Sequence, residues 1–234
     1  MSDQPSREVR NLNALLDVAK ALGAEMQLDN LLPVIISKTT EVIDAERSSL
    51  FIYDEDTNEM WSKVAEGMDS KEIRFPVGVG IAGDVAKTLK TVNIPDAYKD
   101  DRFNPAFDKE TNYRTKSILC MPMLNNEGAL VGVVQVLNKK DGSTFDDKDE
   151  SLLEALSVQA GVAIQRARLL EAFVEKQRIQ ESLKLAADIQ MGMLPKDFPA
   201  FPDRDDFDLF ASIIPAKEVG GDFYDFFLID DDHL

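Results

Sequence analysis

A run of small residues in the middle of the chain is the first place where the sequence points to chemistry. Gly80-Ile81-Ala82-Gly83 stands at the start of a helix predicted over residues 81–90. The first N–H groups of a helix have no partner inside it, and the helix dipole adds positive potential there, so this position suits a phosphate group. Glycines at a helix start more often serve the turn itself, and the sequence leaves both interpretations open.

A polar, irregular segment predicted over residues 95–115 adds groups that can bind a ligand. It carries Asp108, Thr111 and Thr115. Their carboxylate and hydroxyl groups can hydrogen-bond a small molecule closed under a lid, although they serve equally well to cap the loop. Glu66, just after a predicted strand, can accept hydrogen bonds from the edge of a nucleotide base, but surface glutamates are also ordinary.

Composition excludes several other classes of chemistry. With one histidine, His233, next to the end, a Ser-His-Asp triad is not expected and a histidine-rich metal site is excluded. The single cysteine, Cys120, rules out an internal disulfide. The formal net charge of −17 argues against binding to nucleic acid, because a binder of phosphate backbones needs a basic stripe.

The same features predict the compartment. The start of the chain is polar and has no signal-peptide core. The longest apolar stretches, residues 118–124 and 129–137, are far shorter than the roughly 20 residues that span a bilayer. Since one cysteine also fits a reducing environment, we expect a cytoplasmic protein that does not enter a membrane.

The periodicity of apolar residues predicts that the candidate groups are carried by both helices and strands. Helices are predicted over residues 7–26 and 31–43, and the first has an apolar seam suited to another helix, formed by Leu12, Leu15, Ala19, Leu22 and Met26. Alternation then predicts strands over residues 48–53, 60–65, 72–77, 91–94, 117–124 and 129–139. Strands that follow one another in sequence favour a central antiparallel sheet of about six strands with helices on both faces, an α+β fold.

A long helix is predicted over residues 146–193. Its apolar positions keep heptad spacing as far as Val174 and then slip in phase. A parallel homodimer would explain the seams of both terminal helices, although packing on the sheet would explain much of the same pattern. We expect the dimer.

The chain changes character after Pro195. Prolines end the helix, and short strands are predicted over residues 207–214 and 222–229. The acidic clusters at residues 203–208 and 230–232 are interpreted as solvated loops. A piece of about 40 residues buries too little surface to be an independent domain, so we expect the incomplete beginning of one.

Several motifs in the right order resemble the GAF domains of cyclic nucleotide phosphodiesterases and cyanobacterial adenylate cyclases. In NKKDGSTFDDKDE, an Asn-Lys-Phe-Asp-Glu signature is matched by Asn138, Lys139, Phe145, Asp149 and Glu150. DDRFNPAFDKETNYRTKSILCMPM is similar to the lid and strand of these domains, and GIAGDVAKTLKTVNIPDAY to their helix and following strand. The resemblance covers about residues 31–168.

This resemblance implies a cyclic nucleotide, cAMP or cGMP, buried against the sheet beneath a helical lid. It implies that the base, the cyclic phosphate, the lid and the pocket floor are contacted by Ser49, Ala65, Glu66, Ile81, Ala82, Asn104, Asp108, Thr111, Thr115 and Gln135. The signature residues would support the pocket from outside, with Lys139 and Asp149 as a brace.

The implied base preference rests on departures from the family pattern. Ala65 stands where family members use a stacking aromatic, and Asn104 and Gln135 replace bulkier or charged residues of some cGMP-binding members. Glu66 suits a guanine edge, whereas Gln135 offers adenine both a donor and an acceptor. These features conflict, and they favour cAMP only slightly.

The tail resembles a second family. PAKEVGGDFYDFF, preceded by LAADIQMGMLP, is similar to the start of bacterial metal-dependent serine phosphatases of the sporulation stage II protein E type. In that family the aspartate after the paired glycines, here Asp222, helps to bridge two Mg²⁺ or Mn²⁺ ions that activate water for attack on phosphoserine. One carboxylate is not a site, so metal binding is expected in the complete domain only.

Together these features predict an N-terminal dimerisation helix at residues 1–28, a GAF sensor at 29–168, a coiled-coil connection at 169–194 and the start of a phosphatase domain at 195–234. Cyclic nucleotide would close the lid and, through the long helix of a homodimer, control a phosphatase that acts on phosphoserine proteins. The alternatives are a dimerisation scaffold, a sensor of another small molecule, or an active phosphatase, which the missing metal ligands make unexpected.

Overall fold

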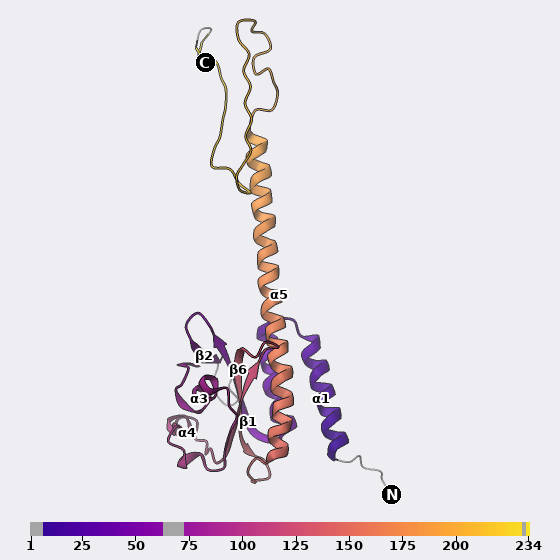
Figure 1. Cartoon of the computed structure of the whole chain (residues 1–234), viewed down its shortest axis with the longest axis vertical. Coiled ribbons are helices and arrows are strands. Elements are labelled where there is room, and N and C mark those ends of the chain that lie inside the picture. Colours follow the sequence, from indigo (N-terminus) through magenta and orange to yellow (C-terminus); the bar gives the residue numbers. More distant parts are fainter. Residues whose placement is uncertain (1–6, 63–72, 231–232) are drawn as a thin grey trace. The chain divides into compact units, whose positions relative to one another are not determined.

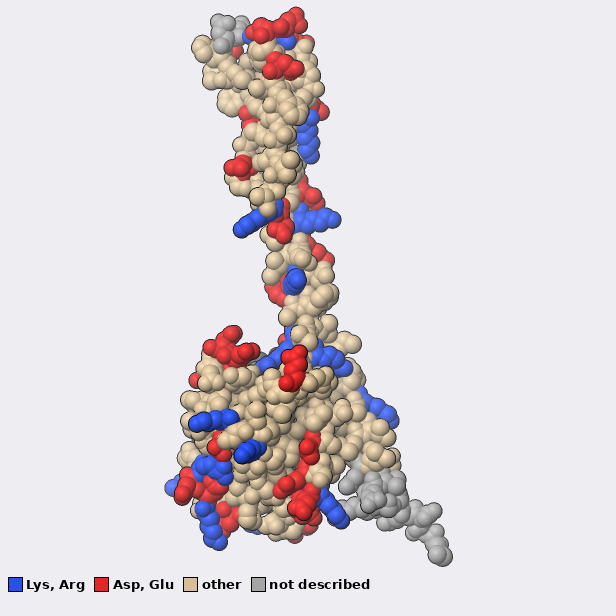
Figure 2. All heavy atoms as spheres, viewed as in Figure 1, with Lys and Arg blue, Asp and Glu red and all other residues tan. Residues whose placement is uncertain are grey.

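The computed structural model describes residues 7–62, 73–230 and 233–234, with side chains from residue 12 onward (Figure 1). The chain forms two compact units, Met1–Leu170 and Glu171–Leu234. None of the helices in the described residues combines the length and the apolar character needed to cross a membrane. On the face of the first unit that Figure 2 presents, lysine and arginine side chains are dispersed among aspartate and glutamate and form no stripe.

The first unit is built on an antiparallel sheet. Its strands are β1 Ala45–Asp54, β2 Glu59–Ser62, β3 Ile73–Pro76, β4 Val92–Ile94, β5 Ile118–Leu124 and β6 Leu130–Lys139. They form a six-stranded sheet in the order β3-β2-β1-β6-β5-β4, and each pair of neighbours is antiparallel. The predicted α+β fold is therefore confirmed.

Helices cover both faces of this sheet (Figure 1). One face carries α1 Arg7–Ala24, α2 Leu28–Ile43 and the first part of α5 Asp147–Met193, and the other carries α3 Gly80–Thr88 and α4 Ala106–Thr111. The prediction that residues 95–115 are irregular was wrong in part, because this segment contains α4 and the short 3-10 helix η1 Ala97–Lys99. Both are too short for apolar residues to repeat at helical spacing.

Strand alternation gives each face its own core. On β1, Leu50 and Ile52 pack with α1, α2 and α5, whereas Phe51 points to the other face and packs near α3. Successive side chains of a strand point to opposite faces, so neighbouring residues serve different cores. The face that carries α3 and α4 is the one that matters for the candidate site.

Small residues let α5 lie close against the sheet. A Cβ atom added to Gly161 would come within 2.4 Å of the carbonyl oxygen of Leu124, so the helix approaches the end of β5 at backbone distance. Much of the apolar seam predicted for this helix is buried in this packing within one chain, at Leu153, Leu156, Ala160, Ala163 and Ala167.

Two arginines fasten α5 to its neighbours in the first unit. Nη2 of Arg166 donates to the carbonyl oxygens of Leu22 at 2.8 Å and Glu25 at 2.6 Å. The last carbonyls of a helix have no partner inside it, so Arg166 caps the C-terminal end of α1. Arg168 donates to the carbonyl oxygen of Tyr53 near the end of β1, at 2.8 Å. The position of α5 is thus tied to both α1 and the sheet.

In the second unit, the described residues after α5 form no strand. The strands predicted over residues 207–214 and 222–229 were therefore wrong. Large side chains of this segment stay open to solvent, with Phe210 74% and Ile214 92% exposed, and a two-stranded pair that buries no apolar face is marginal in water. The segment is instead held by side-chain contacts such as the amide of Gln190, which donates to Gly220 O at 2.7 Å and accepts from Gly220 N at 2.9 Å.

Candidate ligand-binding site

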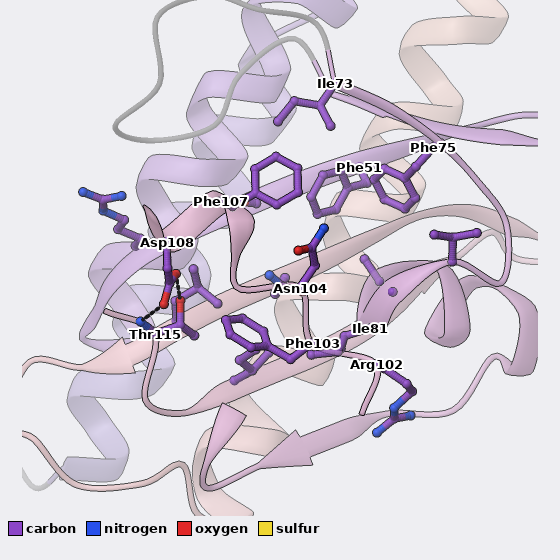
Figure 3. Close-up of a pocket in the computed structure, with 18 of the residues that line it drawn as sticks. Phe51, Ile73, Phe75, Ile81, Arg102, Phe103, Asn104, Phe107, Asp108 and Thr115 are labelled. Carbon is purple, nitrogen blue, oxygen red and sulfur yellow. Dashed lines mark hydrogen bonds between the residues drawn. The ribbon is translucent and has the colours of Figure 1, made fainter. Parts of the chain in front are cut away.

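A cavity of about 400 Å³ lies between the sheet and the helices α3 and α4. This volume falls in the range of about 300–1,000 Å³ typical of small-molecule sites. Eight of the residues predicted to bind a ligand line it: Ser49, Ile81, Ala82, Asn104, Asp108, Thr111, Thr115 and Gln135. The other two predicted residues, Ala65 and Glu66, lie outside the described residues. Figure 3 shows how several of these side chains converge.

The floor of the cavity comes from the two central strands. Ser49 of β1 is paired with Gln135 of β6, so their side chains sit opposite each other on the same face of the sheet. Arg47 and Phe51 lie two residues to either side of Ser49 and line the same cavity. The floor therefore offers a hydroxyl, an amide, a cation and an aromatic ring side by side.

The first turn of α3 forms one end of the cavity. Gly80 has a left-handed φ of +70°, and a Cβ atom at Gly83 would lie 3.1 Å from Gly78 N, so these glycines do serve the turn. At the same time Ile81 and Ala82 line the cavity, and the first turn contains no acidic residue. Turn formation and exposure of the helix N-terminus to a ligand are therefore compatible in this structure.

Asp108 anchors the lid helix α4. Its carboxylate accepts hydrogen bonds from Thr115 N at 2.7 Å, from Thr115 Oγ1 at 2.7 Å and from the Tyr98 hydroxyl at 2.9 Å. Burial, together with the hydrogen bond to this carboxylate, raises the pKa of Tyr98. Thr111 donates to Phe107 O at 2.8 Å. The hydrogen bonds of these predicted ligand-binding residues thus hold the lid in place, and the same residues line the cavity.

Asn104 enters the cavity just before α4, and Figure 3 shows its side chain between those of Phe51 and Phe103. Its Oδ1 accepts a hydrogen bond from Ala106 N at 3.0 Å. Because the oxygen is occupied, Nδ2 is the group that this side chain presents as a donor.

Two of the arginines that line the cavity are held by different partners. Arg102 pairs with Asp84 of α3 and with Asp100, in each case at 2.6 Å, and hydrogen bonds to these carboxylates raise the pKa of the guanidinium. It links the loop before α4 to α3. Arg47 instead stacks on the ring of Tyr113, with its guanidinium carbon 3.9 Å from the ring centroid.

Asn138 joins three segments near the lid. Its Oδ1 accepts from Lys116 N at 2.7 Å and Ser117 N at 3.1 Å, and its Nδ2 donates to Arg114 O and to Glu46 Oε2, each at 2.9 Å. Three of these contacts fix residues 114–117, the stretch that leads from the lid into β5, and the fourth ties Asn138 to β1. Asn138 therefore holds the lid connection in place without lining the cavity.

The other signature residues hold β6, β4 and α5 together. Lys139 donates to both carboxylate oxygens of Asp149, at 2.9 and 2.7 Å. Asn93 of β4 donates to Phe145 O at 3.1 Å and to Glu150 Oε1 at 2.7 Å. Phe145 itself is buried in the core shared with α5. These contacts connect the sheet to the first turn of α5.

Comparison with known proteins identifies the domain. The family model described as GAF domain matches residues 27–164. The chain belongs to the GAF family. It is 35% identical over 192 residues to a probable 3',5'-cyclic phosphodiesterase of Caenorhabditis elegans and 38% identical over 169 residues to a dual 3',5'-cyclic-AMP and -GMP phosphodiesterase 11A of Takifugu rubripes. These matches cover 76% and 67% of this chain and 25% and 19% of the relatives, so the chain spans a quarter of their length or less.

Solved structures agree on the fold. The GAF domain of a phosphoenolpyruvate-protein phosphotransferase from Coxiella burnetii has a TM-score of 0.63 and 22% identity, covering 71% of this chain and 99% of that one. A free methionine-R-sulfoxide reductase from Neisseria meningitidis has a TM-score of 0.59 and 16% identity, covering 72% and 96% of the two chains. At this identity the likeness shows the GAF fold alone.

Several residues that line the GAF cavity were not predicted from the sequence. They are the phenylalanines Phe51, Phe75, Phe103 and Phe107, together with Arg47 and Tyr113. Alternation along β1 was sufficient to find Arg47 and Phe51, because residues two positions from Ser49 share its face. Periodicity predicted no helix over α4, and the helical lid that the family resemblance implied was not assigned a contact from Phe107.

The predicted metal ligand lies in the second unit. Asp222 is exposed, and its backbone oxygen accepts a hydrogen bond from Gln190 at 3.3 Å. Within the described part of the chain, histidine, cysteine and carboxylate side chains form no group of three or more that could hold a metal ion. The role of Asp222 therefore stays a prediction about a complete phosphatase domain.

Proposed function

We propose that this GAF domain is a sensor of a 3',5'-cyclic nucleotide. One observation carries the proposal: the first turn of α3, at Ile81 and Ala82, opens into the same cavity as polar side chains from β1, β6 and the lid. The free amides of that turn suit the cyclic phosphate, and the aromatic and polar groups suit a nucleoside. Relatives whose names specify cAMP and cGMP as substrates support the same ligand class.

For the base, we propose a slight preference for cAMP over cGMP. Gln135, on the cavity floor, can donate to N1 of adenine and accept from its exocyclic amine. The Nδ2 of Asn104 adds a donor on the lid side. The carboxylate of Asp108, which could otherwise accept from the N1–H and amino groups of guanine, is already bonded to Thr115 and Tyr98.

The output is proposed to be a phosphatase domain that begins at residue 195, controlled in a parallel homodimer. α5 begins beside the Lys139–Asp149 pair and continues into the second unit, so it is the element that can carry a change out of the GAF domain. Exposed apolar side chains on α1 and α5 support a helical dimer surface, namely Leu12, Leu16, Val158, Val162 and Leu169. Ligand shifts the dimer only if it binds one arrangement better than the other.

Calorimetric titration of nucleotide-free protein tests the ligand. Cyclic AMP, cGMP and the acyclic control 5'-AMP are titrated in turn. We expect saturable binding of one ligand per chain for the cyclic nucleotides, tighter for cAMP, and much weaker binding of 5'-AMP because of its larger and more highly charged phosphate. Failure of both cyclic nucleotides to bind would refute the proposal.

The proposed transmission of ligand binding through α5, called the relay below, needs its own measurement. Spin labels at Glu175, an exposed polar position of α5 outside the apolar residues of the proposed dimer surface, report the distance between the two α5 helices of a dimer. The label distance is expected to change on addition of cAMP. A saturated GAF domain with an unchanged distance distribution would rule out relay through α5.

A further inference from the structure

Phe107 differs from the other phenylalanines of the cavity. Phe51 and Phe75 pack edge to face with ring centroids 5.1 Å apart, and Phe103 lies against Tyr98, also at 5.1 Å. Among the described residues the ring of Phe107 has no aromatic partner, and the residue is 46% exposed. Its ring is therefore not part of the packed core.

The ring is nevertheless held in one place. Phe107 belongs to α4, and the next residue, Asp108, ties this helix down through Thr115 and Tyr98. Figure 3 shows the Phe107 side chain pointing from α4 toward the space that Phe51 and Asn104 also face. A large aromatic face is thus presented to the cavity by an anchored element, and a flat ligand beneath it would remove that face from water.

We infer that Phe107 stacks on the base of the bound nucleotide and closes the cavity over it. The inference rests on the proposed function and adds the residue that recognises the aromatic part of the ligand. Every nucleobase has a π face, so the contact serves adenine and guanine alike. Phe107 contributes affinity, while the edge of the base is left to Gln135 and Asn104.

Replacement of the ring tests this role. Phe107→Leu keeps an apolar side chain of similar reach but removes the aromatic face, and Phe107→Trp keeps the face. Because stacking on a base is worth about 1–3 kcal/mol, Phe107→Leu is expected to weaken binding of cAMP and of cGMP by a similar factor, between about 5-fold and 150-fold. Phe107→Trp should bind within a few-fold of the parent protein.

A ligand without a base separates stacking from a general effect on the lid. Ribose 3',5'-cyclic phosphate presents the phosphate and sugar alone, and its affinity should be the same for the parent protein and for Phe107→Leu. The matched control Phe173→Leu makes the same change at an exposed position of α5, outside the cavity, and should leave all affinities unchanged. Melting of the ligand-free variants checks that each one is folded.

The outcomes distinguish the two proposals. If the parent protein binds cAMP and Phe107→Leu binds it equally well, the stacking role is wrong and the sensor function stands. An equal loss of affinity for the base-free ligand would assign Phe107 to the lid structure and also overturn stacking. If the parent protein binds no cyclic nucleotide, both proposals fail.

Discussion

The ammonium group of Lys139 donates to both carboxylate oxygens of Asp149, and the two side chains are only 8% and 5% exposed. The pair joins the last residue of β6 to the first turn of α5. Asp149 also accepts a hydrogen bond from Asp146 N at 3.0 Å, so this carboxylate orders the start of the helix. A movement of the sheet can therefore act directly on α5, the helix that we propose carries the signal out of the GAF domain.

Removing one partner of the Lys139–Asp149 pair should strongly destabilise the protein. Lys139→Met or Asp149→Leu leaves a buried charge without its partner and is expected to lower the free energy of unfolding by about 3–5 kcal/mol. The double variant Lys139→Met/Asp149→Leu should lose much less, because no charge is left buried. Urea denaturation measures the free energy of unfolding of the two single variants and the double variant. Lys38→Met, which breaks the exposed Lys38–Glu41 pair, serves as the control and should cost about 1 kcal/mol or less.

Gly161 should not tolerate even a methyl group. Alanine is normally about 1 kcal/mol better than glycine within a helix, yet a Cβ atom here meets Leu124 O at 2.4 Å, which forces α5 away from the sheet. Gly161→Ala is therefore expected to destabilise the protein by about 1–3 kcal/mol. In the control Gly23→Ala, no atom lies within 4 Å of the added Cβ. This control is expected to stabilise the protein. If thermal unfolding shows that Gly161→Ala stabilises the protein as much as Gly23→Ala, the close approach of α5 to Leu124 is contradicted.

Weakening the lid anchor should speed ligand release. Asp108→Asn keeps the shape of the side chain but replaces an acceptor oxygen with an NH₂ group that faces N–H and O–H donors. Hydrogen bonds to a charged group are worth about 1.5–3 kcal/mol, so we expect the dissociation rate of cAMP to rise by about tenfold or more. Stopped-flow displacement measures it. Asp101→Asn, at an exposed position in the preceding loop, controls for the change in charge.

Glu46 should contribute to the loss of protein stability as the pH becomes acidic. Hydrogen bonds from Asn138 and Tyr113 hold the pKa of its carboxylate below the ordinary value. A depressed folded-state pKa means that the stabilisation is complete above the unfolded value of about 4.3 and is lost as the pH falls through the folded value.

The variant Glu46→Gln cannot ionise, so its melting temperature should fall less steeply than that of the parent protein between pH 5 and 3. Melting curves across this range provide the measurement. Glu127→Gln, at an exposed turn position, should follow the parent curve. Identical slopes for Glu46→Gln and the parent protein would contradict the assignment.

The parts of the fold that could be predicted are those with a strong local pattern. Alternation on β1, β5 and β6 and the glycines before α3 each leave a signal in a few consecutive residues. Motif order then placed Ser49, Ile81 and Gln135, which are far apart in sequence, in one cavity.

What the sequence left open depends on contacts between distant residues. The carboxylate of Asp108 is engaged by Tyr98 and Thr115, and the choice between ligand binding and loop capping depends on those partners. Residues 207–214 are mostly apolar, as in a strand, but no packed face holds the segment as a strand, so local propensity alone misleads. The seam of α5 likewise could not show whether its partner is the sheet or a second helix.

Amide NMR of the labelled, nucleotide-free chain during titration with cAMP tests the central claim most directly. We predict saturable shifts at the N–H groups of Ile81 and Ala82, where the cyclic phosphate is expected, and at Phe107 on the lid. Gly23 of α1, on the opposite face of the sheet, should change little. Unchanged Ile81 and Ala82 signals at saturating cAMP, or shifts confined to other surfaces, would contradict a cyclic-nucleotide site in this cavity.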